Sequence, residues 1–184
     1  MRAFIAIDLP PEIHNELAQC QATFRGLCPD ARWTRPEGIH LTLKFLGEIA
    51  DAQVGKVTQA LATLGAIATF PVEIKGFGFF PDARRPRVFW AGVVSPPELA
   101  QLARRIEDAL ETVGVPREQR AYSPHLTLAR FHEPRPRPAL ADAVERQSKT
   151  SLGRFDVREF YLFESRLHPQ GAEYRKVERF PGMR

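Results

Sequence analysis

Apolar and polar positions alternate along the chain in patterns that predict strands and helices in a definite order. Residues 2–9, RAFIAIDL, form an apolar run typical of a buried strand. Prolines follow at positions 10 and 11, and proline is favoured in the first turn of a helix. The alternating residues 40–46, HLTLKFL, predict another strand, which ends at a glycine. The first half then continues with a helix over 51–65, a strand over 70–80 and an exposed loop over 81–87.

The second half of the chain repeats this order of elements. Its pattern predicts a strand over 87–94, a helix from residue 96 to about 113, a strand over 125–131, a stiff connector over 133–138, a helix over 138–148, a strand over 154–164 and a last strand over 173–180. The proline-rich connector is expected to be extended, because proline fixes the backbone and restricts the residue before it.

Shifting the first half by 85 positions aligns it with the second. The tetrapeptide HLTL at 40–43 then meets HLTL at 125–128. The same shift matches further pairs, among them Arg2 with Arg87, Pro11 with Pro96, Leu17 with Leu102 and Phe70 with Phe155. The period is longer than that of solenoid repeats. We therefore expect one bilobal domain over residues 1–184, with an internal duplication at approximately 1–85 and 86–184 and a pseudo-two-fold axis between the copies.

Composition and charge add modest constraints. Of 184 residues, 43% are apolar and 26% charged, as in ordinary soluble globular proteins, and the formal charge of +4 suits a polyanionic partner. Cys20 and Cys28 belong to no CxxC pair or Cys/His cluster, so we expect reduced thiols in a cytoplasmic protein rather than a zinc site. The apolar stretch at the N-terminus is too short for a signal peptide or a membrane span, and no later segment is long enough to span either.

The repeated tetrapeptide is the strongest indication of chemistry. Side chains alternate between the faces of a strand, so His40 and Thr42 share one face while the leucines point to the core. His125 and Thr127 do the same in the second copy. Across a pseudo-two-fold axis, two imidazoles and two hydroxyls would converge. A purely structural duplication would preserve the leucines but has no reason to preserve the polar face in both copies.

A phosphodiester fits that arrangement of groups. Opening a cyclic phosphate requires a base that takes a proton from water and an acid that protonates the leaving sugar oxygen. Histidine can serve in either role near neutral pH, since its ordinary pKa is about 6.5. Threonine hydroxyls can donate hydrogen bonds to the non-bridging phosphate oxygens. This chemistry needs neither a metal nor another cofactor, and we predict none.

The two motifs also resemble those of a known family. HLTLKFLG (40–47) and HLTLAR (125–130) are similar to the paired HxTx signatures of the two-histidine phosphoesterase superfamily. Within it, the chain resembles the LigT-like RNA 2′,3′-cyclic phosphodiesterases, also called the 2′-5′ RNA ligase family. The resemblance covers nearly the whole chain and includes the opening RAFIAIDLP, Trp33, GFGFFP (76–81) and RVFWAGV (87–93).

The resemblance implies an α+β fold with two pseudo-symmetric lobes, each an antiparallel sheet backed by helices, and an active-site cleft between them. It implies hydrolysis of an RNA 2′,3′-cyclic phosphate to a 2′-phosphomonoester, with His40 as proton donor and His125 as proton acceptor. From the residues alone the two roles are interchangeable. The implied partner is RNA or a nucleotide with a cyclic phosphate end, and we expect a monomer with no membrane contact.

Two further residues are candidates for substrate binding. Strict alternation would turn Arg130 away from the face of His125, but a bulge or the end of the strand could return it, and the family resemblance suggests an arginine facing the phosphate here. Its counterpart in the first copy is Phe45, for which the core is an equally good place. Trp33 is a candidate for stacking on a base. The arginines of loop 81–87 could contact RNA phosphates, although a solvated loop is the simpler interpretation.

Other functions remain possible at this point. The same histidines could act as a 2′-5′ RNA ligase or open another cyclic or 2′-5′-linked nucleotide. A protein of another class, a non-catalytic RNA-binding domain, would keep its function without either histidine. A metalloenzyme is a poor candidate, because no carboxylate or cysteine falls at ligand spacing near either motif.

Overall fold

Nine strands and four α-helices make up the part of the chain that is described. A computed structural model describes residues 1–169 and 171–181. In chain order its elements are β1 (Arg2–Ile7), α1 (Pro11–Arg25), β2 (Arg32–Trp33), the 3₁₀ turn η1 (Pro36–Gly38), β3 (Leu41–Glu48), α2 (Asp51–Ala62), β4 (Phe70–Phe80), β5 (Val88–Val94), α3 (Pro97–Glu111), β6 (His125–Arg130), α4 (Pro138–Arg146), β7 (Ser151–Val157), β8 (Phe160–His168) and β9 (Gly171–Phe180).

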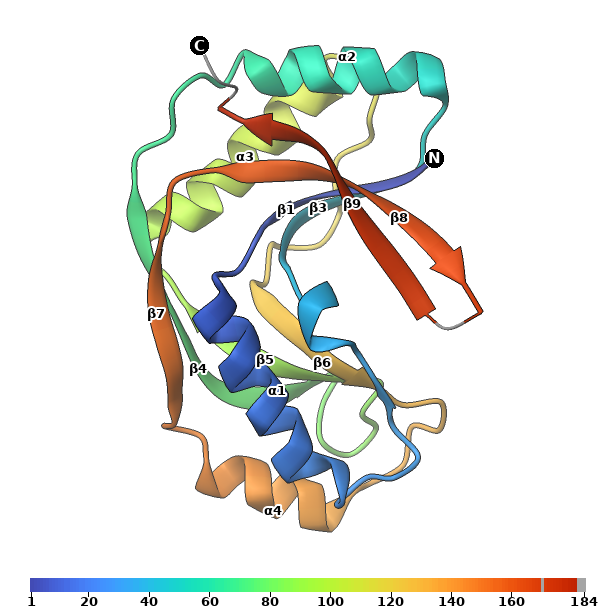
Figure 1. Ribbon diagram of the computed structural model, residues 1–184, viewed down its shortest axis with the longest axis vertical. Helices are drawn as coiled ribbons and strands as arrows, with labels where there is room; N and C mark the ends of the chain where they lie inside the picture. Colours follow the sequence, from blue (N-terminus) through green and yellow to red (C-terminus); the bar gives the residue numbers. More distant parts are fainter. Residues whose placement is uncertain (170, 182–184) are drawn as a thin grey trace.

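The strands form two antiparallel sheets, and each sheet takes strands from both halves of the chain. The first has the order β3-β1-β8-β9 and the second the order β2-β6-β5-β4-β7. In the first, β1 lies between β3 and β8; in the second, β5 lies between β6 and β4. Strand β4 of the first half pairs with β5 and β7 of the second, and β8 of the second half pairs with β1 of the first, so the two lobes are interleaved (Figure 1).

Helices cover the outer face of each sheet, which gives the α+β architecture expected from the resemblance. Helices α2 and α3 lie beside the first sheet and α1 and α4 beside the second, at opposite ends of the molecule (Figure 1). The helices begin at or near prolines, except α2, and present buried side chains such as Leu17 and Phe24 of α1 and Leu102 and Ile106 of α3 to the core. This packing leaves the opposite faces of the two sheets for the site.

One predicted strand is wrong. The segment 154–164 is predicted as a single strand, but it contains the end of β7 and the start of β8, which belong to different sheets. The chain passes from one sheet to the other at Arg158 and Glu159. A continuous pattern of strand-forming residues does not reveal such a crossing, because the pattern carries no information on which neighbour each segment pairs with.

Each of the two strands that carry the repeated motif has a β-bulge at the same place. In β3, Ala6 pairs with Thr42 and Ile5 with Lys44, so Leu43 is the additional residue. In β6, Trp90 pairs with Thr127 and Phe89 with Ala129, so Leu128 is the additional residue. Leu43 and Leu128 are equivalent in the duplication. A bulge reverses the alternation of side chains beyond it, and this decides which later residues face the groove described below.

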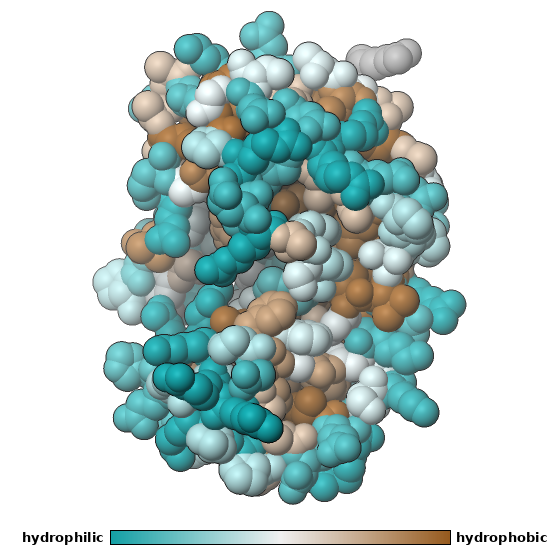
Figure 2. Space-filling view, turned by 180° about the vertical axis from the view of Figure 1, so that it is seen from behind, coloured by the Kyte–Doolittle hydropathy of each residue, from teal (hydrophilic) through white to brown (hydrophobic). Residues whose placement is uncertain are grey.

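The face drawn in Figure 2 is mainly hydrophilic. In this view, polar side chains surround smaller groups of apolar ones, as expected when most large apolar residues lie in the core.

Both cysteines are free and buried, and burial raises the pKa of Cys20 to about 12 and that of Cys28 to about 11. Across the described residues, each helix is too short or too polar to cross a membrane.

Candidate active site

A groove of about 560 Å³ lies between the two sheets and receives side chains from both. The four residues of the repeated motif, His40, Thr42, His125 and Thr127, all line it. The other lining residues are Arg2, Ala3, Phe4, Thr34, Gly38, Ile39, Phe45, Gly47, Arg130, Ser165, Leu167, Ala172 and Tyr174. The structure therefore brings together the groups that the sequence placed on equivalent strands.

The two imidazoles are held in the same way. His40 Nδ1 lies 2.9 Å from the carbonyl oxygen of Gly38, and His125 Nδ1 lies 2.8 Å from that of Ser123. Each carbonyl is two residues before its histidine, and the two are equivalent in the duplication. A carbonyl can only accept, so each Nδ1 carries the hydrogen and donates it. In the neutral rings, both Nε2 atoms are then left with a lone pair for proton transfer.

The bulges bring Arg130 and Phe45 to the groove. Beyond Leu128, Ala129 is buried and Arg130 is exposed at the groove, where strict alternation would have placed them the other way round. Beyond Leu43, Phe45 likewise lines the groove. Arg130 thus lines the groove, and its contact with a phosphate stays a prediction. Phe45, for which a core position was equally plausible, is 70% exposed.

His40 sits in an apolar enclosure. Its side chain is only 6% exposed. The rings of Phe163, Tyr174 and Phe4 surround the imidazole at centroid distances of 4.4, 5.3 and 5.8 Å. Burial in these surroundings lowers the pKa of His40 to about 4, since an imidazolium loses solvation there, although the nearby charge of Asp8 opposes the change.

A carboxylate that the sequence analysis did not assign to the site lies next to His40. Asp8 Oδ1 is 4.0 Å from His40 Nε2 and 3.9 Å from His14 Nε2, and Asp8 Oδ2 is 2.6 Å from Lys176 Nζ. Burial alone would raise the pKa of Asp8, but His14 and Lys176 outweigh it and hold that pKa well below its usual range. Asp8 is therefore ionised beside His40. It interrupts the apolar run 2–9, and that interruption was the signal available in the sequence.

His14 of α1 also belongs to this arrangement. Its Nδ1 lies 2.7 Å from the carbonyl oxygen of Pro36, and its side chain is 20% exposed. The carboxylate of Asp8 raises the pKa of His14. A helix position alone does not indicate these contacts, because Asp8 and Pro36 belong to segments that only the tertiary fold brings to α1.

His125 has a more open and more positive environment than His40. Its ring meets the edge of Phe80 at a centroid distance of 4.8 Å. Burial lowers the pKa of His125, the hydrogen bond to Ser123 opposes this, and the charge of Arg130 lowers the pKa further. The two imidazoles thus have different charged neighbours. The carboxylate of Asp8 raises the pKa of His40 while the cations of His14 and Lys176 lower it, and the guanidinium of Arg130 lowers the pKa of His125.

Both tryptophans pack against aromatic side chains of the fold. Trp33, the candidate for base stacking, is not one of the described residues that line the groove; its ring packs against Phe89 at 6.1 Å and under the guanidinium of Arg25. Trp90 is only partly buried and lies on the same face as Thr127, with which it is paired. Its ring covers Gly78, where an added Cβ would come within 2.3 Å of it.

A buried lysine holds β3 to α3 and to the segment that leads to β6. Lys44 of β3 is 6% exposed and donates to Glu107 Oε2 at 2.6 Å and to the carbonyl oxygen of Pro116 at 2.9 Å. Glu107 belongs to α3, and Pro116 belongs to the segment that leads to β6. The cation therefore connects the strand that follows His40 with the segment that precedes His125.

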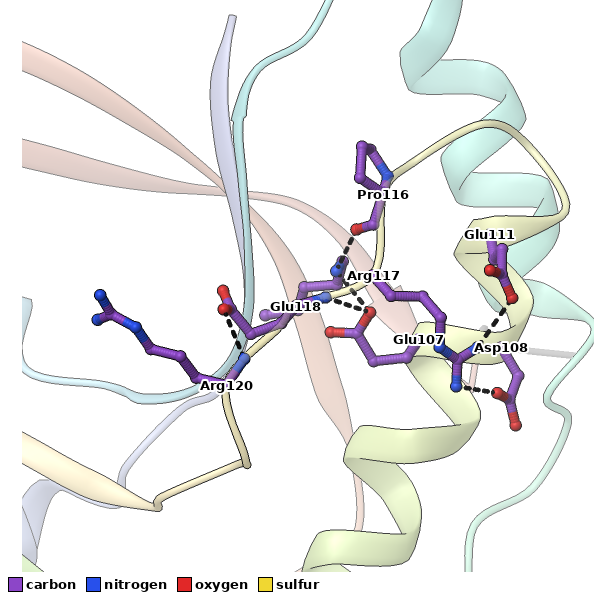
Figure 3. Close-up of polar contacts among 8 residues, drawn as sticks. Glu107, Asp108, Glu111, Pro116, Arg117, Glu118 and Arg120 are labelled. Atoms are coloured by element: carbon purple, nitrogen blue, oxygen red, sulfur yellow. Dashed lines mark hydrogen bonds and ion pairs between the residues drawn. The ribbon is translucent and has the colours of Figure 1, made fainter.

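The same segment is held to α3 by further polar contacts (Figure 3). Arg117 donates to Asp108 at 2.6 Å and to Glu111 at 2.9 Å, and the backbone N–H of Glu118 donates to Glu107 at 3.3 Å. These contacts fix the start of the path toward His125. They lie at the surface, so each contributes less to stability than the buried pair.

Comparisons with known proteins agree with this geometry. Residues 9–169 match the model of the 2'-5' RNA ligase superfamily. An RNA 2',3'-cyclic phosphodiesterase of Methanothermobacter thermautotrophicus is 32% identical over 181 residues, which cover 98% of each chain. The crystal structure of TT0787 of Thermus thermophilus superposes with a TM-score of 0.81 and 28% identity, covering 98% of this chain and 97% of that one.

A second solved structure is similar over the whole chain. The crystal structure of E. coli LigT complexed with 3'-AMP superposes with a TM-score of 0.80 and 25% identity, covering 100% of this chain and 98% of LigT. The match to the family model extends over most of the chain, and the relative with 32% identity over nearly all of it. Together with the paired motif in one groove, they show that this chain belongs to the 2'-5' RNA ligase superfamily.

Proposed function

We propose that this protein is an RNA 2′,3′-cyclic phosphodiesterase, which hydrolyses a cyclic phosphate at an RNA end to a 2′-phosphomonoester. The observation that carries the proposal is the pair of imidazoles in one groove, each with its Nδ1 held by a carbonyl and its Nε2 left for chemistry. The name of the archaeal relative supports the substrate. We further propose that the protein acts as a monomer.

The proposed reaction is an in-line displacement with balanced proton transfers. His125 Nε2 takes a proton from water, and the water oxygen forms a bond to phosphorus. The bond from phosphorus to the 3′ oxygen breaks, and His40 Nε2 donates its proton to that oxygen. The product carries its phosphate on the 2′ oxygen. Exchange with solvent then returns the proton to His40 and removes it from His125.

The surroundings of the two rings support this assignment of roles. The Asp8 carboxylate, 4.0 Å from His40 Nε2, favours the protonated form that an acid requires. Near His125, the charge of Arg130 favours the neutral form that a base requires. Burial opposes the acid role of His40, but a bound phosphate carries negative charge and would raise the pKa of both rings.

The remaining groups of the groove are proposed to hold the phosphate. Thr42 and Thr127 lie on the same faces as the histidines and can donate hydrogen bonds to the non-bridging oxygens. Arg130 can supply a bidentate, charge-assisted contact to the same oxygens. These donors would stabilise the charge that builds up as water attacks. The proposed chemistry uses side chains alone.

The direct test is incubation of the purified protein with adenosine 2′,3′-cyclic phosphate in EDTA, followed by separation of the 2′ and 3′ products. We expect adenosine 2′-monophosphate to form. Formation of the 3′ isomer would show that the bond from phosphorus to the 2′ oxygen breaks instead. If the protein opens no cyclic nucleotide but cleaves a 2′-5′-linked dinucleotide, the proposed substrate is wrong and the dinucleotide takes its place. Activity that EDTA abolishes and added metal restores would contradict the mechanism.

The pH dependence provides a further prediction. One histidine acts protonated and the other neutral, so kcat/KM should follow a bell-shaped profile. Because the pKa values of both His40 and His125 are lowered in the free protein, the optimum of kcat/KM should lie on the acid side of pH 6.5, the ordinary histidine value. The profile of kcat should lie at higher pH, because bound phosphate raises both pKa values.

The variant Asp8→Asn tests whether His40 contributes to this profile. Loss of the carboxylate removes a charge that raises the pKa of His40, so the limb of the profile that His40 controls should move toward acid pH. Initial rates measured across the acid and alkaline limbs for both proteins would show this. A rate that continues to rise at alkaline pH, or a profile in which neither limb moves, is incompatible with His40 as the acid.

A further inference from the structure

The groove contains apolar side chains that neither proton transfer nor phosphate binding explains. Among the described residues, the two most exposed large hydrophobic side chains are Phe45 and Leu167, each 70% exposed. Both line the groove of the histidine pair, whereas the other exposed examples, Val94 and Leu27, lie outside it. Single exposed apolar residues are ordinary on a protein surface. Two exposed apolar side chains that lie in one polar groove and come from different strands indicate contact with an apolar part of a ligand.

The position of Phe45 relative to the chemistry is defined by the rings between them. Phe45 pairs across the sheet with Phe4, and their ring centroids are 6.1 Å apart. The Phe4 ring is in turn 5.8 Å from the imidazole of His40. Phe45 therefore lies one aromatic ring beyond the proposed acid. This is within the span of a single nucleotide whose phosphate lies at the histidines.

Leu167 lies farther along the same face. It follows Ser165 by two residues on β8, so both side chains point to the same side of the sheet, and both line the groove. Ser165 pairs with Arg2 of β1, which lines the groove as well. The apolar surface of Phe45 and Leu167 is thus bordered by polar groups, which is the usual composition of a site that orients a mixed ligand.

The duplication makes the place of Phe45 informative. Phe45 and Arg130 are equivalent residues, and equivalent bulges bring each of them to the groove. The repeated His and Thr are the same in both copies, but these two positions differ in chemistry. One offers a guanidinium suited to phosphate and the other a π-face suited to a planar ring. A nucleotide has both parts, and this asymmetry would allow it to bind in only one orientation.

We propose that Phe45 and Leu167 form the binding surface for the nucleobase of the nucleotide that carries the cyclic phosphate. This inference rests on the proposed function for the identity of that nucleotide. The base stacks on Phe45 and contacts Leu167, while its phosphate lies between the histidines on the side of Arg130. Stacking on an aromatic face accepts any base, so the site selects single-stranded ends, whose terminal base is unpaired, over paired ends.

The test compares a ligand that has a base with one that lacks it. Binding of adenosine 2′-monophosphate and of methyl ribofuranoside 2-phosphate is measured by calorimetry, so the result does not depend on turnover. Phe45→Ala should weaken binding of the nucleotide about 10- to 100-fold and leave binding of the base-free phosphate unchanged. Phe45→Trp should retain nucleotide binding, Leu167→Ala should weaken it several-fold, and Val94→Ala, an exposed apolar residue outside the groove, should have no effect.

The outcomes separate this inference from the proposed function. Equal weakening of both ligands by Phe45→Ala, or no weakening of either, overturns the base-binding surface while leaving the hydrolysis proposal intact. A wild-type protein that binds the nucleotide through Phe45 but opens no cyclic phosphate overturns the hydrolysis proposal and supports the surface. A wild-type protein that does not bind the nucleotide overturns both. Because Phe45 is exposed, circular dichroism should show that Phe45→Ala folds normally.

Discussion

His40→Ala and His125→Ala are each expected to reduce kcat/KM for adenosine 2′,3′-cyclic phosphate by about 10²- to 10⁴-fold. Each variant removes one partner of the proposed acid–base pair, and general acid or base catalysis typically contributes a factor of that size. The double variant should lose little more than the worse single variant, because the two rings act as a unit. Initial rates at the optimal pH of each protein would measure these losses.

Controls for this experiment come from the same chain. His132→Ala removes an exposed histidine outside the groove and should leave the rate unchanged. Thr42→Val and Thr127→Val remove one hydrogen bond each to the phosphate and should slow the reaction roughly tenfold, less than loss of a histidine. Retention of full activity without either histidine would favour a non-catalytic RNA-binding domain. Greater loss from the threonine variants than from the histidine variants would reverse the proposed ranking.

Lys44→Met is expected to lower the free energy of unfolding by about 3–5 kcal/mol, the usual cost of losing one partner from a buried ion pair. The side chain of Lys44 is 4% exposed, and its removal leaves the carboxylate of Glu107 unpaired beside the core and the carbonyl of Pro116 without its donor. Activity should also fall, because this contact connects the strand after His40 to the segment before His125. Urea unfolding measures the first effect.

Two further variants, one that also replaces Glu107 and one that breaks a surface ion pair, provide the comparison for the stability of Lys44→Met. The double variant Lys44→Met/Glu107→Met should recover much of the lost stability, because it leaves no uncompensated carboxylate. Arg117→Ala breaks an exposed pair in the same segment and should change stability only slightly. If Lys44→Met loses no more stability than Arg117→Ala, the buried pair does not hold the two halves together.

Much of the site could be predicted from the sequence because its signals are local. His40 and Thr42 are two residues apart on a strand with apolar neighbours, and strand alternation alone places them on one polar face. The second copy at His125 and Thr127 indicates that this face is used twice. The prolines that start α1, α3 and α4 likewise mark helix starts that depend on the backbone of the nearest residues.

Other features of the site depend on which strands pair. Strict alternation places Arg130 on the wrong face, and only the bulge at Leu128 returns it to the groove. A bulge is a property of two paired strands, so one strand's sequence does not contain it. The position of Phe45 was undecided for the same reason. Asp8 approaches His40 only because the end of β1 lies beside the start of β3 in the folded sheet.

The sequence by itself determined most of the order of elements, the doubled motif and the residue types available for chemistry, because these follow from side-chain properties and from spacings of a few residues. Only the tertiary structure decided that strands β4 and β8 pair with the sheet of the other half, that Lys44 of β3 pairs with Glu107 of α3, and that an arginine and a phenylalanine occupy equivalent places in the groove. These outcomes depend on contacts between residues far apart in the chain, whose energies no local pattern records.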